Sequence, residues 1–214
     1  MSSYTLRYFN IPVRGETAKV LLHLSGADWK VETPDWPKDK DAQPVGKLPV
    51  LIETPADSSA AKPFVLTETA AIEYYLASKG GYIYQPDDAM HIARQMELRS
   101  QIADLCSAFV DWKLGPNEQK TKLKENLDST ARYLIRYHEQ LLKENGSNGH
   151  YFGSEISFVD IVLFAHITAL RTAFSGLEAD TLELLSEKNA PGINKVVSAV
   201  AAESALASFV AETK

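Results

Sequence analysis

The chain has 214 residues, a length that allows one large domain or two small ones, each able to bury a hydrophobic core. Apolar residues make up 45% of it and charged residues 23%, and no apolar run reaches the roughly 18 residues of a membrane helix, so a globular protein is expected. The net charge of −6 argues against nucleic acid or an anionic membrane as the main partner, and it requires an anionic ligand to find basic residues gathered at its site.

The first eighty residues predict alternating short strands and helices. Residues 4–9 are rich in β-branched and aromatic side chains and predict a strand. Residues 17–25 have apolar side chains at helical spacing and are followed by Gly26, which predicts a helix that ends there. A further strand is expected before residue 49, then strands over 49–53 and 64–66, and a helix over 69–78 that Gly80 and Gly81 end.

From about residue 89 the pattern is helical throughout. Long helices are predicted around residues 102–109 and 127–141, an almost wholly apolar one over 161–170, and shorter ones over about 180–187, 191–202 and 204–210. The expected fold class is therefore α/β plus all-α, with a first domain over residues 1–80, a linker over 81–88 and an all-helical domain over 89–214.

The chain is expected to be cytoplasmic. Residues 1–5 lack the basic and apolar stretches of a secretory signal. Cys106 is the single cysteine and cannot form an intrachain disulfide, which fits a reducing compartment. Cys106, His138 and His166 fall on apolar helix faces and are interpreted as core residues, and the five histidines show no metal-ligand spacing.

Two short segments have the character of a binding site. Pro49 begins a predicted strand, where a cis bond after Leu48 is permitted, and the backbone N–H and C=O of Leu48 could then pair with a peptide-like ligand. Thr69 is expected at a helix N-cap, where free N–H groups suit a carboxylate, and Glu68 beside it could hold an ammonium group. Both segments also have ordinary structural explanations, a proline at a strand start and a plain N-cap.

A third segment predicts its own local structure. Ser157 precedes the apolar helix and Asp160 follows three residues later, which is the spacing of a capping box. Ile156 and Ile161 can close the same turn as a hydrophobic staple. Asp160 is therefore interpreted as structural and not as catalytic.

Taken in order, these segments resemble the tyrosine-type cytosolic glutathione transferases. Residues 4–10 followed by 14–16 look like the opening of that family, and residues 152–160 resemble its capping box. Residues 35–37, 40 and 46–49 are similar to its sigma class in order and spacing. Residues 13–15 and the second half have pi-like features. The resemblance covers residues 4–209. It implies a thioredoxin-like N-terminal domain, a helical second domain that contributes the hydrophobic substrate pocket, a homodimer, and a glutathione site near the subunit interface.

The resemblance also implies a role for each matching residue. Tyr8 would bond the glutathione sulfur, and the glycine end would be surrounded by Arg14, Trp36, Lys40 and Lys47. The cysteinyl backbone would pair with Leu48, held by Pro49, and the γ-glutamyl group would contact Glu68, Thr69 and, from the partner subunit, Asp104. Glutathione would act as a co-substrate.

The chain departs from the family pattern at several points. Sigma and pi members usually carry Gln-Ser where Glu68 and Thr69 stand, which blurs the class. Val45 stands where some classes insert an aromatic side chain into the partner, and the loop over residues 54–63 is longer than in close relatives. The paired acids that bind a metal in some sigma enzymes are missing around Asp104, so no metal is predicted.

A tyrosine can activate a thiol because only the thiolate attacks electrophiles. A hydrogen bond to a charged group contributes about 1.5–3 kcal/mol, which lowers the thiol pKa by about one to two units. Ser2 and Ser3 precede the predicted strand, so a serine arrangement fits poorly, and no cysteine lies near residues 8–17. The alternative for Tyr8 is a packed strand aromatic.

Two apolar roles and three functions stay open. Phe9, Phe109 and Trp112 could line a pocket for the second substrate, although Phe109 and Trp112 suit the core equally. The leading function is conjugation of glutathione to hydrophobic electrophiles, as in detoxification; glutathione-dependent isomerisation or peroxide reduction is an alternative. A non-catalytic, crystallin-like or ligand-carrying protein is the second reading. A redox protein would need a cysteine in the first turn, where residues 11–13 are Ile-Pro-Val.

Overall fold

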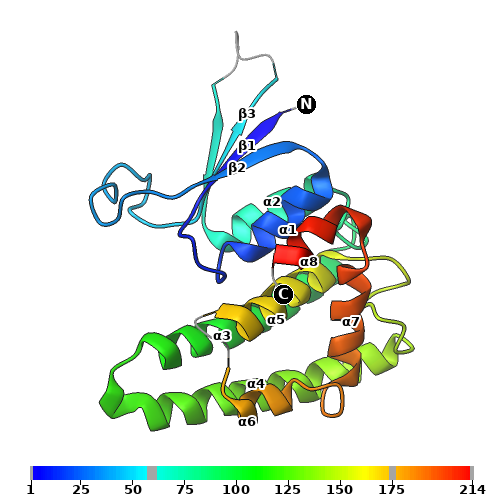
Figure 1. The fold of residues 1–214 in the computed structure, drawn as a ribbon. Coiled ribbons are helices and arrows are strands. Elements are labelled where there is room, and N and C mark those ends of the chain that lie inside the picture. The colour runs from blue at the N-terminus through cyan, green and yellow to red at the C-terminus, as the bar shows by residue number, and fades with distance from the viewer. Residues whose placement is uncertain (1, 57–61, 174–176, 213–214) are drawn as a thin grey trace. The chain divides into compact units, whose positions relative to one another are not determined.

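The computed structural model describes residues 2–56, 62–173 and 177–212 (Figure 1). Residue contacts divide the chain into two compact units, over residues 1–81 and 82–214. The elements of the first unit are β1 (Ser3–Arg7), α1 (Glu16–Ser25), β2 (Asp28–Glu32), β3 (Val50–Thr54), β4 (Phe64–Thr67) and α2 (Thr69–Lys79). Those of the second are α3 (Ala89–Leu114), η1 (Asn117–Gln119), α4 (Lys120–Glu144), α5 (Phe158–Thr172), α6 (Ala179–Leu184), α7 (Pro191–Ala201), η3 (Ser204–Leu206) and α8 (Ala207–Glu212). The predicted α/β segment followed by helices is confirmed.

The first unit is built on a four-stranded sheet in the order β2-β1-β3-β4. β1 pairs with β2 in parallel, and β3 is antiparallel to both β1 and β4. Side chains alternate along β1, where Tyr4 and Leu6 are buried. The predicted order of strands and helices is confirmed, although β1 begins at Ser3 and ends at Arg7, so that Tyr8 follows the strand instead of ending it.

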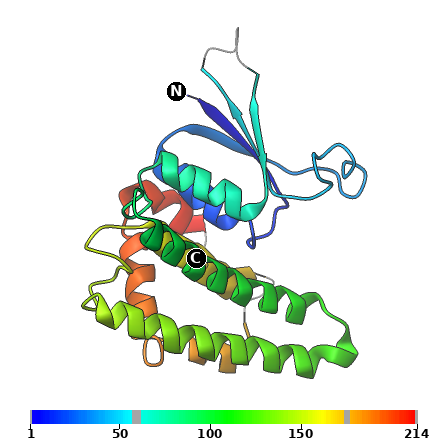
Figure 2. The same cartoon turned by 180° about the vertical axis from the view of Figure 1, so that it is seen from behind.

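Helices α1 and α2 lie side by side in both views (Figures 1 and 2). α1 buries Val20, Leu21 and Leu22, and it ends at Gly26, whose left-handed backbone (φ 63°) lets its N–H donate to the carbonyl of His23 at 3.2 Å. The helix begins at Glu16, one residue before the predicted start.

The start of α2 differs from the prediction in a way that concerns the site. Glu68, not Thr69, occupies the N-cap position, and Thr69 is already the first helical residue. The expectation that Thr69 caps the helix is therefore wrong by one residue. Glu68 takes φ 69° and ψ 122°, a conformation that a residue with a Cβ adopts at a cost in free energy.

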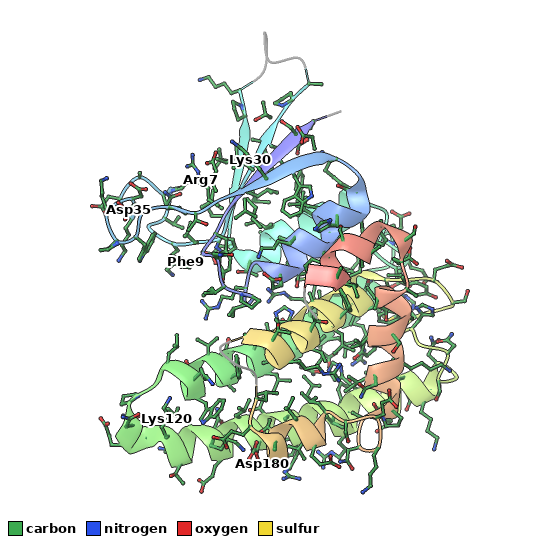
Figure 3. All side chains as sticks on the ribbon, in the orientation of Figure 1. Arg7, Phe9, Lys30, Asp35, Lys120 and Asp180 are labelled. Carbon is green, nitrogen blue, oxygen red and sulfur yellow. The ribbon has the colours of Figure 1, made fainter. Side chains whose placement is uncertain are left out.

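In the second unit, α3 and α4 run side by side in opposite directions (Figures 1 and 2). Lys120 lies where α4 begins (Figure 3). α5 is buried along almost its whole length and contacts α3 and α7, so the almost wholly apolar sequence over 161–170 belongs to a central helix, as predicted. The bounds of α6, α7 and the final helical segment differ from the predicted ones by a few residues.

The capping box at the start of α5 is confirmed. The buried carboxylate of Asp160 accepts the backbone N–H of Ser157 at 2.7 Å and that of Tyr151 at 2.9 Å. Because the Ser157 N–H lies at the helix start and the Tyr151 N–H in the loop before it, the carboxylate stabilises both the first turn of α5 and that loop.

The two helical histidines are core residues, as predicted. His138 accepts the hydroxyl of Tyr151 at 2.5 Å through one ring nitrogen and donates to Gln101 at 3.0 Å through the other. His166 donates to the carbonyl of Val162 at 3.0 Å. Burial lowers the pKa of each ring to about 4. Cys106 is also buried.

Phe109 and Trp112 are buried with their ring centroids 6.0 Å apart, which favours the core interpretation for this pair. No single one of the described helices has the length and apolar composition to cross a membrane. Residues Pro191–Ala201 and Ser204–Ala211 have that length and composition only when taken together, and a bend of 84° separates them. Of the long loop predicted over 54–63, residues 57–61 lie outside the described part of the chain.

Candidate functional site

The candidate residues of the first unit lie at one end of the sheet. Because β1, β2 and β4 run in the same direction and β3 runs against them, three strands end where β3 begins. The register places Arg7, Val50 and Thr67 side by side on neighbouring strands. The residues one step beyond them are Tyr8, Pro49 and Glu68, so pairing alone brings these three segments together.

Tyr8 is held at this end by its backbone and by its side chain. Its N–H donates to the carbonyl of Glu32 at 3.1 Å, and its side chain is buried, with 3% of the residue exposed. Its hydroxyl oxygen accepts the backbone N–H of Arg14 at 3.0 Å. A hydroxyl that accepts a hydrogen bond is polarised and becomes a stronger donor in its turn, so the contact with Arg14 suits a hydroxyl that donates to a ligand.

Aromatic contacts join the loop after β2 to the end of β1. The ring of Phe9 lies 5.8 Å from that of Tyr8 and meets the ring of Trp36 edge-on at 5.4 Å. Figure 3 shows Phe9 at the end of β1 and Asp35 in the loop that projects beyond it. Both the Leu48–Pro49 bond, as the sequence permitted, and the Trp36–Pro37 bond are cis.

Lys40 and Lys47 lie on one compact turn. The backbone N–H of Gln43 donates to the carbonyl of Lys40 and that of Gly46 to the carbonyl of Gln43, both at 3.1 Å. Gly46 has φ 61°, and a Cβ added to it would lie 3.7 Å from Cε of Lys40, so the Lys40 side chain passes over the residue that precedes Lys47. Both lysines are exposed. The turn therefore offers two ammonium groups to an anion, on a chain of net negative charge.

The remaining contacts come from backbone and charge. Leu48 precedes the paired part of β3, which begins at Val50, so its backbone lies beyond the ladder. Glu68 is exposed and carries the strained backbone of the α2 N-cap. The first N–H groups of α2 follow at Thr69. The Glu68 carboxylate next to these N–H groups suits an amino-acid head group. The ammonium of the ligand would pair with Glu68, and the carboxylate of the ligand would accept the N–H groups.

Two residues at the start of α1 lie next to this site, and their place was not predicted from the sequence. Glu16 is buried, which raises the pKa of its carboxyl, while the ammonium of Lys19 at 2.6 Å acts in the opposite direction. Gly15 is buried against the ring of Tyr8. The sequence signal for Gly15 was its place beside Arg14, but its role depends on a contact with a residue seven positions earlier.

Asp104 belongs to the second unit. It lies exposed on α3 and lines a groove of about 410 Å³ between α3 and α4. The other lining residues are Gln101, Thr130, Tyr133, Leu134, Arg136 and Tyr137. The groove therefore carries one acid and one base between aromatic rings.

The described residues contain no group of three or more His, Cys, Asp or Glu side chains arranged to hold a metal ion. That the protein works without a metal stays a prediction.

Comparisons with known proteins identify the family. Residues 4–78 match the family model described as "Glutathione S-transferase, N-terminal domain", and residues 103–213 match "Glutathione S-transferase, C-terminal domain". The chain belongs to the glutathione S-transferase family. It is therefore a member of a transferase family, and the resemblance deduced from residues 4–209 is confirmed at the level of the family.

Three relatives show how far the likeness extends. The chain is 30% identical to a class-mu 28 kDa glutathione S-transferase of Schistosoma japonicum, over 79% of this chain and 82% of that one. It is 27% identical to S-crystallin SL11 of Nototodarus sloanii, over 77% and 78%. A sigma class transferase of Fasciola hepatica has the same fold, with a TM-score of 0.80 at 21% identity, over 100% and 97%. The thioredoxin-like and helical architecture is confirmed, whereas the class is not resolved between these relatives.

Proposed function

We propose that this transferase binds reduced glutathione at the strand ends of the first unit and conjugates its thiolate to hydrophobic electrophiles, with Tyr8 as the activating residue. The single observation that carries the proposal is the buried Tyr8, which directly follows β1 and whose hydroxyl is fixed by the N–H of Arg14. A tripeptide whose cysteine paired with Leu48 would present its sulfur to that hydroxyl.

The charges around the hydroxyl match those of glutathione. The glycine carboxylate would lie near Lys40 and Lys47, with the guanidinium of Arg14 and the ring of Trp36 beside it. At the other end, the γ-glutamyl ammonium would pair with Glu68 and its carboxylate with the N–H groups that begin at Thr69. Pro49 holds Leu48 at the start of β3 between these ends. Each pairing joins opposite charges or a donor to an acceptor.

The chemical step needs only the sulfur, the hydroxyl and the electrophile. Tyr8 donates to the sulfur and stabilises the thiolate, by about one to two pKa units for a hydrogen bond of about 1.5–3 kcal/mol. The thiolate then attacks the electrophilic carbon, and a halide leaves, or an enone takes up a proton after addition. Removal of glutathione should therefore abolish activity, and no metal is required.

The active form is proposed to be a homodimer. Asp104 would reach the γ-glutamyl group bound by the partner subunit. Such a role would account for an exposed carboxylate in the groove between α3 and α4. Val45 is 51% exposed and stands in place of the aromatic side chain that some classes insert into the partner, so other contacts would hold the dimer. From membership of the same family we also infer a cytoplasmic location and a part in detoxification.

A binding protein without catalysis is the second candidate. It is supported by the S-crystallin among the relatives, a protein 27% identical to this chain whose name is not that of an enzyme. Isomerisation or peroxide reduction by the same thiolate is a variant of the first candidate. The two candidates differ in turnover and not in glutathione binding.

Three measurements on the purified protein separate these possibilities. Retention on glutathione-agarose with elution by free glutathione is expected, and flow-through under gentle buffer conditions would remove the site. Conjugation of glutathione to 1-chloro-2,4-dinitrobenzene is expected at a measurable rate. Retention without turnover of this substrate, of enones and of hydroperoxides would favour the binding protein. Light scattering should give a dimer mass at micromolar concentration, and a monomer mass would contradict the role of Asp104.

A further inference from the structure

Gly15 stands at a position where its backbone does not require glycine. It precedes α1 with φ −85° and ψ −12°, a right-handed helical conformation that any residue adopts without strain. At such a helix start, side chains that accept a hydrogen bond stabilise the helix at least as well as glycine. The reason for glycine must therefore be the space around it.

The ring of Tyr8 fills the space that a side chain on Gly15 would need. A Cβ built on Gly15 would lie 2.5 Å from Cδ1 of Tyr8 and 2.9 Å from both Cγ and Cε1. Carbon atoms that are not bonded to one another normally lie about 3.5–4.0 Å apart. Since Cγ and Cδ1 are at the root of the ring, they cannot yield unless the whole ring moves.

We infer that Gly15 is a positioning residue for the activating tyrosine, an inference that rests on the proposed function. The ring of Tyr8 packs on the bare Cα of Gly15. The hydroxyl of Tyr8 accepts a hydrogen bond from the N–H of Arg14, the residue before Gly15. Two consecutive residues thus hold one side chain, at its base and at its tip. Because the ring is rigid, a shift at its base, where it contacts Gly15, also moves the hydroxyl at its tip, where it contacts Arg14.

An added methyl group at Gly15 must displace either the ring or the turn that carries Arg14. In both cases the hydroxyl moves relative to the Arg14 N–H and to a bound sulfur, and hydrogen bonds weaken steeply with distance and angle. A displacement of about 1 Å can cost roughly a hundredfold in rate. Of the residues proposed to hold the two ends of glutathione, only Arg14 adjoins Gly15. Lys40 lies in the loop after β2 and Glu68 at the start of α2, so binding should suffer less than the chemical step.

The test compares Gly15→Ala with Gly80→Ala, which adds the same methyl group at an exposed residue with a similar backbone (φ −80°) in the same unit. Conjugation kinetics and the ultraviolet absorbance of the bound thiolate are measured against pH. We expect kcat to fall about tenfold in Gly15→Ala, with little change in the KM for glutathione and with the thiolate appearing at higher pH. Gly80→Ala should match the wild type. An unchanged kcat and thiol titration in Gly15→Ala would overturn the inference.

A double variant separates an effect through Tyr8 from a general disturbance. If Gly15 acts on the hydroxyl, Gly15→Ala in a Tyr8→Phe background has no further effect on the rate, because the group that it misplaces is gone. A further fall in that background would refute the inference. If Tyr8→Phe itself is as active as the wild type, the proposed function fails instead, so the two failures are distinct.

Folding is checked by thermal unfolding. If Gly15→Ala is too unstable to assay, the same change is made in Tyr8→Ala, where the ring no longer fills the space. The loss in Tm should then disappear. An equal loss of Tm in both backgrounds would mean that Gly15 serves something other than the ring of Tyr8.

Discussion

The backbone N–H of Arg14 donates to the hydroxyl oxygen of Tyr8 at 3.0 Å, while the Arg14 side chain is exposed. Under the proposed function this residue contributes in two independent ways, by its backbone to Tyr8 and by its guanidinium to the ligand. Substitution of the side chain leaves the backbone donor in place, so the two contributions can be separated.

Substitution of Arg14 tests this separation. Arg14→Ala should raise the KM for glutathione about three- to tenfold, since an exposed charge pair contributes about 1 kcal/mol, and should change kcat less than twofold. Steady-state conjugation kinetics with glutathione varied at saturating electrophile measure both. A fall in kcat as large as that of Tyr8→Phe would mean that the side chain, and not the backbone, sets the state of the tyrosine.

The lysine turn predicts a salt-dependent affinity. Lys40→Ala and Lys47→Ala should each raise the KM for glutathione about two- to fivefold at low ionic strength, and less at high salt, because exposed charges are screened. Lys38→Ala is the matched control. Lys38 is exposed on the same loop, 3.5 Å from Asp35, and has no proposed contact with the ligand. Equal effects of all three substitutions would indicate general electrostatics instead of a defined carboxylate site.

Glu68 is predicted to recognise the γ-glutamyl ammonium. Glu68→Gln keeps the size of the side chain and removes its charge, so the KM for glutathione should rise about tenfold, the loss of one charge-assisted hydrogen bond. With a glutathione analogue that lacks the amino group, the variant and the wild type should bind with similar affinity. An unchanged preference for the amino group in Glu68→Gln would take Glu68 out of the site.

The buried histidines predict that stability falls in mild acid. Burial lowers the pKa of His138 to about 4, against 6.5 for an ordinary histidine, so the unfolded chain binds more protons between these two values. The free energy of unfolding should therefore fall as the pH drops through that window, by roughly 2 kcal/mol from this group between pH 7 and pH 5. His166, with its pKa also near 4, adds to the same trend.

Denaturant unfolding at several pH values, followed by the helical signal, measures this slope. In His138→Gln the amide can still accept from Tyr151 and donate to Gln101, but it cannot be protonated. The share of the slope that belongs to His138 should disappear in this variant. A slope identical to that of the wild type would show that the acid sensitivity has another source.

Features of the sequence that depend on near neighbours were the ones predicted well. The Ser157–Asp160 capping box, the end of α1 at Gly26 and the central helix α5 each follow from a few adjacent residues. The cis bond at Leu48–Pro49 could be anticipated from a proline at a strand start, whereas Pro37 lies in a loop and its cis bond had no such signal. The error at Thr69 arose because Glu68 takes a positive φ, a conformation that its residue type does not predict.

Features that depend on distant contacts could not be predicted. The packing of Tyr8 on Gly15 and the bond from Arg14 exist only once β1 and α1 are in place. The approach of the Lys40 side chain to Gly46, next to Lys47, likewise depends on the turn at Gly46. The sequence located the candidate residues through a family resemblance, whereas the register of β1, β3 and β4 supplied the physical reason that their ends meet.

The most direct test of the central claim compares the wild type with Tyr8→Phe in the conjugation of glutathione to 1-chloro-2,4-dinitrobenzene. We expect a clear wild-type rate and a fall of at least about tenfold in the variant, which corresponds to the loss of a hydrogen bond of about 1.4 kcal/mol or more to the thiolate. The variant should still bind to glutathione-agarose. A Tyr8→Phe enzyme with the wild-type rate would mean that another group activates the thiol, and the assignment of Tyr8 would be wrong.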